Sequence, residues 1–231
     1  MALDEHEELI RSTMAELTTN FGAATPIDDT LASVTAAAVH LISGVDCADV
    51  LLIKDGEYQS TAATSEVAPT VDAAQRCTGE GPCLDASGPA VMIRCDDISE
   101  DSRWPHFAPA ALAAGVHSVM SFQLYNHAAD TGALNLFGYH PRRFNAESEA
   151  IGAMLATHAA TALIAANRQH QFESALASRD VIGQAKGIIM ERLGLDAVRA
   201  FEFLARMSQN SNTPVAVIAQ EIAERSGHKY R

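Results

Sequence analysis

Residues 45–63 decide the fold, and they read Val-Asp-Cys-Ala-Asp-Val-Leu-Leu-Ile-Lys-Asp-Gly-Glu-Tyr-Gln-Ser-Thr-Ala-Ala. Residues 45–54 have the pattern of a β-strand that ends in four consecutive apolar side chains. Asp55-Gly56 is a strong signal for a tight hairpin turn, and residues 57–63 follow as the return strand. Because a hairpin joins antiparallel neighbours, this stretch predicts an antiparallel sheet.

Further strands and helices alternate on both sides of this hairpin. Residues 116–125 and 133–139 have strand patterns joined by a polar turn, and a shorter apolar run covers residues 90–93. The predicted helices are residues 3–19, residues 28–42 with a cap at Asp28 or Asp29 and an end at Gly44, and an alanine-rich segment between Pro105 and Gly115. Hairpin-length turns dominate, so the pattern favours an α+β domain with a central antiparallel sheet flanked by helices over a doubly wound sheet.

A long helical segment begins at Asn145 and leads out of this domain. Its apolar positions recur at helical spacing, which predicts a connecting helix over about residues 145–192. Gly183 and Gly187 interrupt the pattern, and we expect them to allow close packing. A periodic stretch of more than about 25 residues is typical of a long connecting helix or a coiled coil. We therefore expect a homodimer formed through this helix; the alternative is a helix packed on its own sheet.

Two short helices complete a compact all-α bundle of three. Gly194 ends the long helix, and Asp196 is the expected cap of a helix over residues 197–209. Thr213-Pro214 is a cap and first-turn pair that opens a third helix, which ends before Gly227. The predicted organisation is an N-terminal helix (1–24), the α+β domain (25–166) and the helical bundle (167–231).

The composition is that of an ordinary soluble protein. The 231 residues are 48% hydrophobic and 19% charged, which is enough apolar material for a real core. No run approaches the roughly 18 apolar residues of a membrane span. The acidic N-terminus lacks the basic start and apolar stretch of a secretion signal. The composition therefore predicts a cytoplasmic protein.

The net charge of −13 at first argues against a nucleic-acid partner, because binding phosphate requires basic surface. The charge is unevenly distributed, however. Residues 168–231 hold nine Lys and Arg against seven Asp and Glu, a formal charge of +2, which leaves −15 for residues 1–167. Such asymmetry hints at a segment that faces nucleic acid, although a mixed-charge bundle is more often simply solvated.

Residues 179–192, which read Arg-Asp-Val-Ile-Gly-Gln-Ala-Lys-Gly-Ile-Ile-Met-Glu-Arg, strongly resemble the opening of the ANTAR domain. Residues 200–208 and 217–222 fit its second and third helices, so the resemblance spans about residues 170–226. ANTAR proteins are transcription antitermination regulators. They bind paired RNA stem-loops in nascent transcripts and so prevent a terminator hairpin from forming. The resemblance implies the same function for this chain.

The preceding domain looks like a bacterial GAF domain over about residues 25–166. The similar stretches are residues 79–86, 101–105, 115–119 and 132–136. In particular they resemble the GAF domain that precedes ANTAR in actinobacterial regulators. GAF domains are usually sensory: they bind a small molecule or a partner and pass the signal along a connecting helix. The resemblance therefore implies a small-molecule ligand, whose binding residues the sequence does not identify.

Within the ANTAR-like bundle, basic side chains are the candidates for RNA contact. Lys186 lies between core-type positions and should reach solvent along its stem, so we expect it to contact phosphate or loop bases. Further candidates are Arg179, Arg192, Arg206 and, for a polar base contact, Ser208. The alternatives are a solvated flank for the bases and an ordinary polar turn for the serine. We expect Phe201 and Phe203 in core and flank rather than as stacking platforms.

Cys83 and Cys95 leave an enzymatic alternative open. Cys83 follows a turn over residues 79–82, where a helix N-terminus could lower the pKa of its thiol. A GAF-based thiol redox sensor or enzyme, such as the GAF-fold family that reduces free methionine sulfoxide, would use Cys83 with Cys95 as its partner. The usual state of an unbridged cysteine is a small buried thiol, however, and no metal, haem or nucleotide-binding motif is evident. We expect no catalysed chemistry, no cofactor and no metal.

Overall fold

The computed structural model describes residues 2–22, 26–86, 90–127 and 130–227. They belong to two compact units, Met1–Ile164 and Ala165–Arg231. The first unit is an α+β domain and the second is all-helical. This is the fold class that the hairpin at residues 45–63 and the helical periodicity after residue 145 predict.

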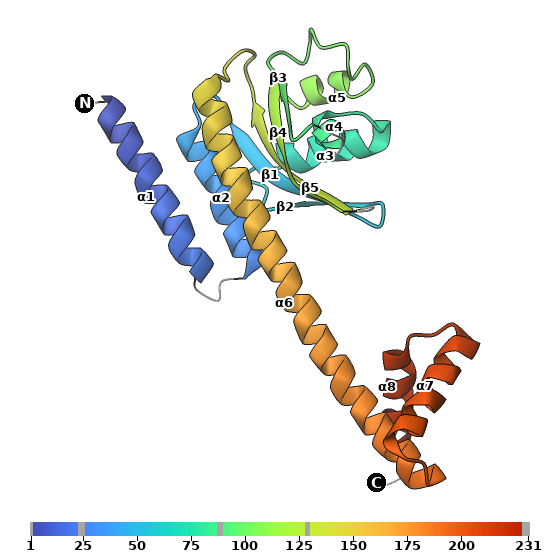
Figure 1. The fold of residues 1–231 in the computed structure, drawn as a ribbon. Coiled ribbons are helices and arrows are strands. Elements are labelled where there is room, and N and C mark those ends of the chain that lie inside the picture. Colours follow the sequence, from blue (N-terminus) through green and yellow to red (C-terminus); the bar gives the residue numbers. More distant parts are fainter. Residues whose placement is uncertain (1, 23–25, 87–89, 128–129, 228–231) are drawn as a thin grey trace. The chain divides into compact units, whose positions relative to one another are not determined.

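A five-stranded antiparallel sheet forms the centre of the first unit (Figure 1). Its strands are β1 (Cys47–Lys54), β2 (Glu57–Thr61), β3 (Met92–Cys95), β4 (Ser118–His127) and β5 (Asp130–Gly138). Their order across the sheet is β2-β1-β5-β4-β3, and every neighbouring pair is antiparallel. The antiparallel sheet predicted from the sequence is confirmed.

The turn between β1 and β2 has the predicted hairpin geometry. Asp55 and Gly56 both have positive φ angles, 51° and 81°. A turn with positive φ at both central residues matches the twist of the flanking strands, and the Asp-Gly pair adopts it readily. The backbone N–H of Asp55 also donates to Asp130 Oδ1 at 3.3 Å, which joins the turn to the start of β5.

One face of the sheet is covered by α2 (Ile27–Leu41) and the first part of α6 (Ala146–Leu193), and α1 (Ala2–Gly22) packs on α2 (Figure 1). Even-numbered residues of β1 and β5, such as Val50 and Leu136, enter this core together with Leu155 of α6. Gly152 lets α6 approach the sheet, because an added Cβ would lie 2.6 Å from the ring of Phe122. The start of α6 is therefore packed directly on the central strands.

The opposite face is covered by α3 (Val67–Thr78), α4 (Pro82–Ala86) and α5 (Ala108–Ala113). Its apolar contacts fall into two clusters. One surrounds Trp104 and Phe107 near β3 and β4, and the other surrounds Leu51 and Cys83. Between these clusters the sheet presents polar side chains, which form the site described below.

The second unit is a small bundle made by the end of α6, α7 (Ala197–Ser211) and α8 (Val215–Gly227). Its buried apolar residues are Ala185, Ile189, Ala200, Leu204, Ile218 and Ala219. Gly194 ends α6 with a φ of 64°, as predicted. Asp196 caps α7, because its carboxylate accepts from the backbone N–H groups of Val198 and Arg199. This cap is also confirmed.

Several local predictions are wrong. The residue that precedes the first turn of α2 is Pro26, and Asp28 and Asp29 lie inside that turn, where a negative charge favours the helix dipole. Thr213 does not cap α8: among the described residues its hydroxyl donates to the carbonyl of Ser211 and accepts no hydrogen bond from the first turn of α8.

Gly183 and Gly187 do not serve close packing within the chain. An added Cβ at either position would meet nothing within 4 Å, and both residues are exposed. Helix α6 continues through both of them to Leu193. Their effect inside the chain is therefore only the lower helix propensity of glycine.

Helix α6 contains an 18-residue window that is long and apolar enough to cross a membrane. One such helix is weak evidence, because a helix that contributes to the core of a soluble protein passes the same test. Ile151, Leu155 and Ala159 of α6 are buried in the first unit against the sheet. Packing explains part of this apolar composition, since 33% of the window is buried.

Candidate functional site

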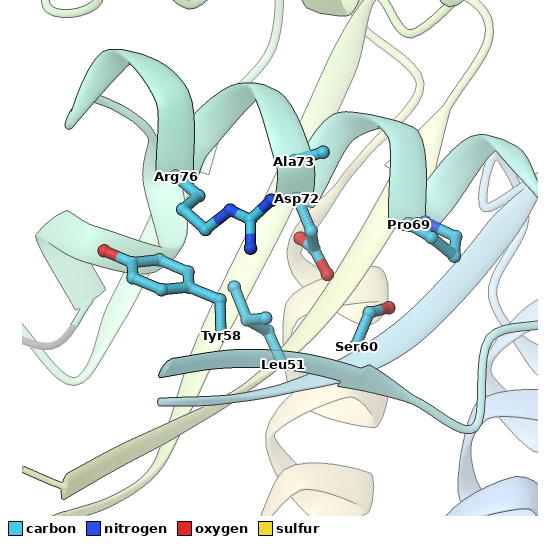
Figure 2. Close-up of a pocket in the computed structure, with 7 residues that line it drawn as sticks. All are labelled: Leu51, Tyr58, Ser60, Pro69, Asp72, Ala73 and Arg76. Atoms are coloured by element: carbon cyan, nitrogen blue, oxygen red, sulfur yellow. The ribbon is translucent and has the colours of Figure 1, made fainter. Parts of the chain in front are cut away.

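A pocket of about 170 Å³ lies between α3 and the β1–β2 hairpin (Figure 2). Its lining residues are Leu51, Tyr58, Ser60, Pro69, Asp72, Ala73 and Arg76. The strand residues come from one side and the α3 residues from the other. Asp72 and Arg76 are one helical turn apart on α3, so both side chains project from the same face toward the hairpin.

Asp49 of β1 forms the polar floor beside this pocket. It is fully buried, and its two carboxylate oxygens accept hydrogen bonds from Asn135 Nδ2 at 3.1 Å and from Ser60 Oγ at 2.5 Å. Asn135 of β5 is oriented in turn by Ser121 Oγ, which donates to its Oδ1 at 2.7 Å. The strand register explains this grouping, because Asp49 and Asn135 are directly opposite each other in the β1–β5 ladder.

Asp72 faces this network from α3. The side chain is buried, with a relative exposure of 3%, and its Oδ1 accepts from Gln75 Nε2 at 3.0 Å and from Asn135 Nδ2 at 3.4 Å. Asp72 Oδ2 is also buried and has no donor among the described residues; the adjacent Asp49 carboxyl can pair with Asp72 only when one of the two holds a proton. Leaving a buried acceptor unpaired costs about 1–3 kcal/mol, so this oxygen favours a donor in the pocket.

The two buried carboxylates, Asp49 and Asp72, are not neutralised by an ion pair with any described residue. Burial raises the pKa of Asp49, and burial together with the adjacent Asp49 raises the pKa of Asp72 well above its ordinary value of 3.8. The pair therefore retains a proton to higher pH than two exposed carboxyl groups would.

The sequence pattern does not reveal this site. Asp49 lies within the predicted strand, and Asn135 lies in a stretch used only for the GAF resemblance. Helix α3 was not predicted, although Val67, Val71 and Ala74 have helical spacing that could have revealed it. The other usable signal is Asp49, an acidic residue between apolar neighbours on β1, which lies inside the sheet.

The second unit exposes a different candidate surface around Lys186. The ammonium Nζ of Lys186 on α6 lies 6.0 Å from the ring centroid of Phe201 on α7, within the range of a cation–π contact. Phe201 is 45% exposed and Phe203 is 37% exposed. The expectation that these phenylalanines lie in core and flank is therefore wrong for Phe201, whose ring is available at the surface.

The other predicted RNA-contacting residues are distributed over both helices. Arg179 is exposed and lies seven residues, or about two turns, before Lys186, so the two share a face of α6. Arg192 and Arg206 are also exposed, on a different part of α6 and on α7. Ser208 has a local role, because its hydroxyl donates to the carbonyl of Thr213 at 2.5 Å in the turn after α7.

Comparison with protein families identifies both units. A model described as GAF domain matches residues 24–164, which is more than half of the chain. The chain belongs to the GAF domain family. A model described as ANTAR domain matches residues 170–222. GAF and ANTAR domains are thus both present, which is the domain content of an ANTAR-type regulator.

Solved structures confirm the fold of the GAF unit. The GAF domain of a phosphoenolpyruvate-protein phosphotransferase from Coxiella burnetii has a TM-score of 0.54 and 18% identity, covering 70% of this chain and 96% of that one. An N-acylhomoserine lactone dependent LuxR family transcription factor from Burkholderia cenocepacia has a TM-score of 0.54 and 13% identity, and the match covers 67% of this chain and 93% of that one. The reduced form of fRMsr of Staphylococcus aureus has a TM-score of 0.52 and 12% identity, and the match covers 68% of this chain and 94% of that one. A search of curated proteins gave no significant match.

The buried thiols of Cys83 and Cys95 are not activated. Cys83 is fully buried, and burial raises the pKa of its thiol well above the ordinary value, so the expectation that a helix N-terminus lowers it is wrong. Burial also raises the pKa of Cys95 to about 12. The two residues belong to separate apolar clusters, and none of the four cysteines is in a disulfide. Since the thiolate is the nucleophile, this arrangement disfavours thiol chemistry at Cys83.

Proposed function

We propose that the chain is a signal-responsive transcription antitermination regulator of the actinobacterial GAF–ANTAR type. Its ANTAR domain binds paired RNA stem-loops in nascent transcripts, and its GAF domain controls that binding. The observation that carries the proposal is the ANTAR match over residues 170–222. The function places the protein in the cytoplasm, where nascent transcripts are made, and it requires no catalysed reaction.

Lys186 is the centre of the proposed RNA-binding surface. Its ammonium group lies over an exposed aromatic ring, Phe201, and Arg179 extends the same face of α6. A cation supplies phosphate neutralisation, and an exposed ring supplies a surface for an unpaired loop base. Arg192 and Arg206 add charge elsewhere on the bundle, and Ser208 supports the surface indirectly, because its hydroxyl holds the turn after α7.

Control by the GAF domain would run through α6. The helix begins on the sheet, where Arg94 of β3 donates to Glu149 Oε1 at 2.6 Å and to the carbonyl of Phe144 at 2.5 Å. The same helix ends in the ANTAR core at Ile189. A change at the sheet that alters the position of Glu149 would therefore act on the element that carries Lys186. Helix α6 is therefore the element through which the GAF domain and the RNA-binding surface can influence each other.

Exposed apolar side chains on α6 support a homodimer. Phe172 is 62% exposed and Leu176 is 45% exposed, and the two lie one turn apart on the same face. A second copy of this helix would cover them, and two bundles would then engage two linked stem-loops with greater avidity. Light scattering of the full chain at micromolar concentration, with and without RNA, tests this. A monomer under both conditions contradicts the dimer.

RNA binding is tested by fluorescence anisotropy of the full chain with a synthetic double stem-loop RNA across a salt series. Lys186→Ala is expected to weaken binding about tenfold and to reduce the salt slope by roughly one. Lys54→Ala, which removes an exposed lysine at the β1–β2 hairpin, is the matched control and should bind as the wild type. Equal binding by both variants, or no binding by the wild type at low salt, contradicts the proposal.

A further inference from the structure

We propose that the pocket between α3 and the β1–β2 hairpin binds a small zwitterion of the free amino acid class, with its ammonium group at Asp72 and its carboxylate at Arg76. This inference rests on the proposed function, since it names the signal that the GAF domain would sense. It is carried by two side chains of opposite charge on one wall of the same pocket (Figure 2).

The ammonium end follows from the unpaired oxygen of Asp72. The side chain is buried, and its Oδ1 is occupied by two neutral amides while its Oδ2 has no partner. An ammonium group supplies three donors and a positive charge. It would satisfy Oδ2 and also offset the repulsion between Asp72 and Asp49, which a neutral donor would leave in place.

The carboxylate end follows from Arg76. Among the described residues, Arg76 forms no hydrogen bond or ion pair, and it does not pair with Asp72 although the two are four positions apart on α3. Its planar guanidinium group offers two parallel donors that match a carboxylate. Figure 2 shows this group extended over Tyr58 and Leu51, on the side of the pocket away from Pro69.

The size and lining of the pocket limit the ligand. The cavity volume of about 170 Å³ lies below the roughly 300–1,000 Å³ of pockets for drug-sized ligands, so a small ligand is expected. Leu51, Tyr58, Pro69 and Ala73 provide apolar surface between the two charged groups. A small metabolite with both charges and a short side chain fits these limits.

The test is a thermal-shift screen of the full chain against the twenty L-amino acids, followed by calorimetric titration of the best one. Its amine and its carboxylic acid, each lacking one charged group, are titrated beside it. The amino acid is expected to bind about tenfold or more tightly than either analogue. Wild-type protein that binds no amino acid up to about 10 mM overturns the inference.

Two variants assign the ends of the ligand. Asp72→Asn and Arg76→Gln are each expected to weaken binding about tenfold or more. Glu66→Gln, an exposed acid at the start of α3, and Arg143→Gln, an exposed arginine, are the charge-matched controls and should bind normally. Unchanged binding in Asp72→Asn or in Arg76→Gln overturns the inference. Because Arg76 is exposed, its variant remains informative even if Asp72→Asn alters folding.

RNA binding by the same preparations separates this inference from the proposed function. Ligand-free wild type that binds the double stem-loop RNA but no amino acid refutes only the pocket assignment. Protein that binds an amino acid with the expected variant effects but no RNA refutes the proposed function and leaves the pocket assignment supported.

Discussion

The two units of the chain keep their chemically informative groups in opposite places. In the GAF unit they are buried: Asp49, Asp72 and Asn135 lie inside, between α3 and the sheet. In the ANTAR unit they are on the surface, where Lys186 and Phe201 meet above a core of only six buried apolar residues. The first arrangement suits a ligand that is enclosed, and the second suits a partner too large to enclose. The charge differs between the two parts as well: residues 1–167 are acidic, and residues 168–231 are slightly basic.

The largest expected effect breaks the smaller core. Leu204→Ala should lower the free energy of unfolding of the ANTAR bundle by about 2–5 kcal/mol, because Leu204 is fully buried among few neighbours. Calorimetry should show the bundle melting earlier while the GAF transition is unchanged. Val198→Ala, at a position of α7 that is 69% exposed, should shift neither transition. A single transition that moves as a whole would contradict the independence of the two units.

The next prediction sharpens the meaning of the buried acids. Because the pKa of Asp72 is raised, the folded protein holds a proton there that the unfolded chain releases, so stability falls as pH rises from about 3.8 through the raised pKa. Asp72→Asn removes this penalty and should stabilise the GAF unit by roughly 1–3 kcal/mol at neutral pH. The gain should vanish below about pH 3.8. Thermal melts across pH test it, and a destabilised variant at neutral pH would contradict it.

A smaller effect is expected where the GAF unit holds α6. Arg94→Ala removes the hydrogen bonds to Glu149 and to the Phe144 carbonyl and should cost about 1–2 kcal/mol. Hydrogen exchange should accelerate in the first turns of α6, near Glu149. Arg142→Ala removes exposed ion pairs with Glu100 and Asp97 and should have a smaller effect on stability, because solvent screens exposed pairs. Equal exchange in the two variants would argue against Arg94 as the attachment point.

The smallest effect concerns the thiols. In the native protein only Cys77, which is exposed, should react with a thiol reagent. Burial raises the pKa of the Cys47 thiol to about 11 and that of the Cys95 thiol to about 12. Burial also raises the pKa of the Cys83 thiol well above its ordinary value, so the reactive thiolate is scarce at neutral pH. Cys83→Ser should react as the wild type does. Rapid modification of Cys83 would revive the thiol redox alternative.

The sequence predicted what depends on local pattern. The Asp55-Gly56 hairpin, the helix end at Gly194 and the cap at Asp196 each depend on a few neighbouring residues, and the structure confirms all three predictions. The acid pair was not found, because Asp49 and Asp72 are brought together by the packing of α3 on the sheet rather than by their spacing in the chain. The same reason explains Phe201, whose spacing suits a core position but whose ring lies at the surface beside Lys186.

Crosslinking and sequencing of the RNA bound in cells tests the central claim most directly. The wild type and Lys54→Ala should recover the same set of transcripts, enriched in paired stem-loops that precede a terminator hairpin, and Lys186→Ala should lose that enrichment. Recovery of no specific RNA by the wild type, or of an unchanged set by Lys186→Ala, would contradict the account of this chain as an RNA-binding antitermination regulator.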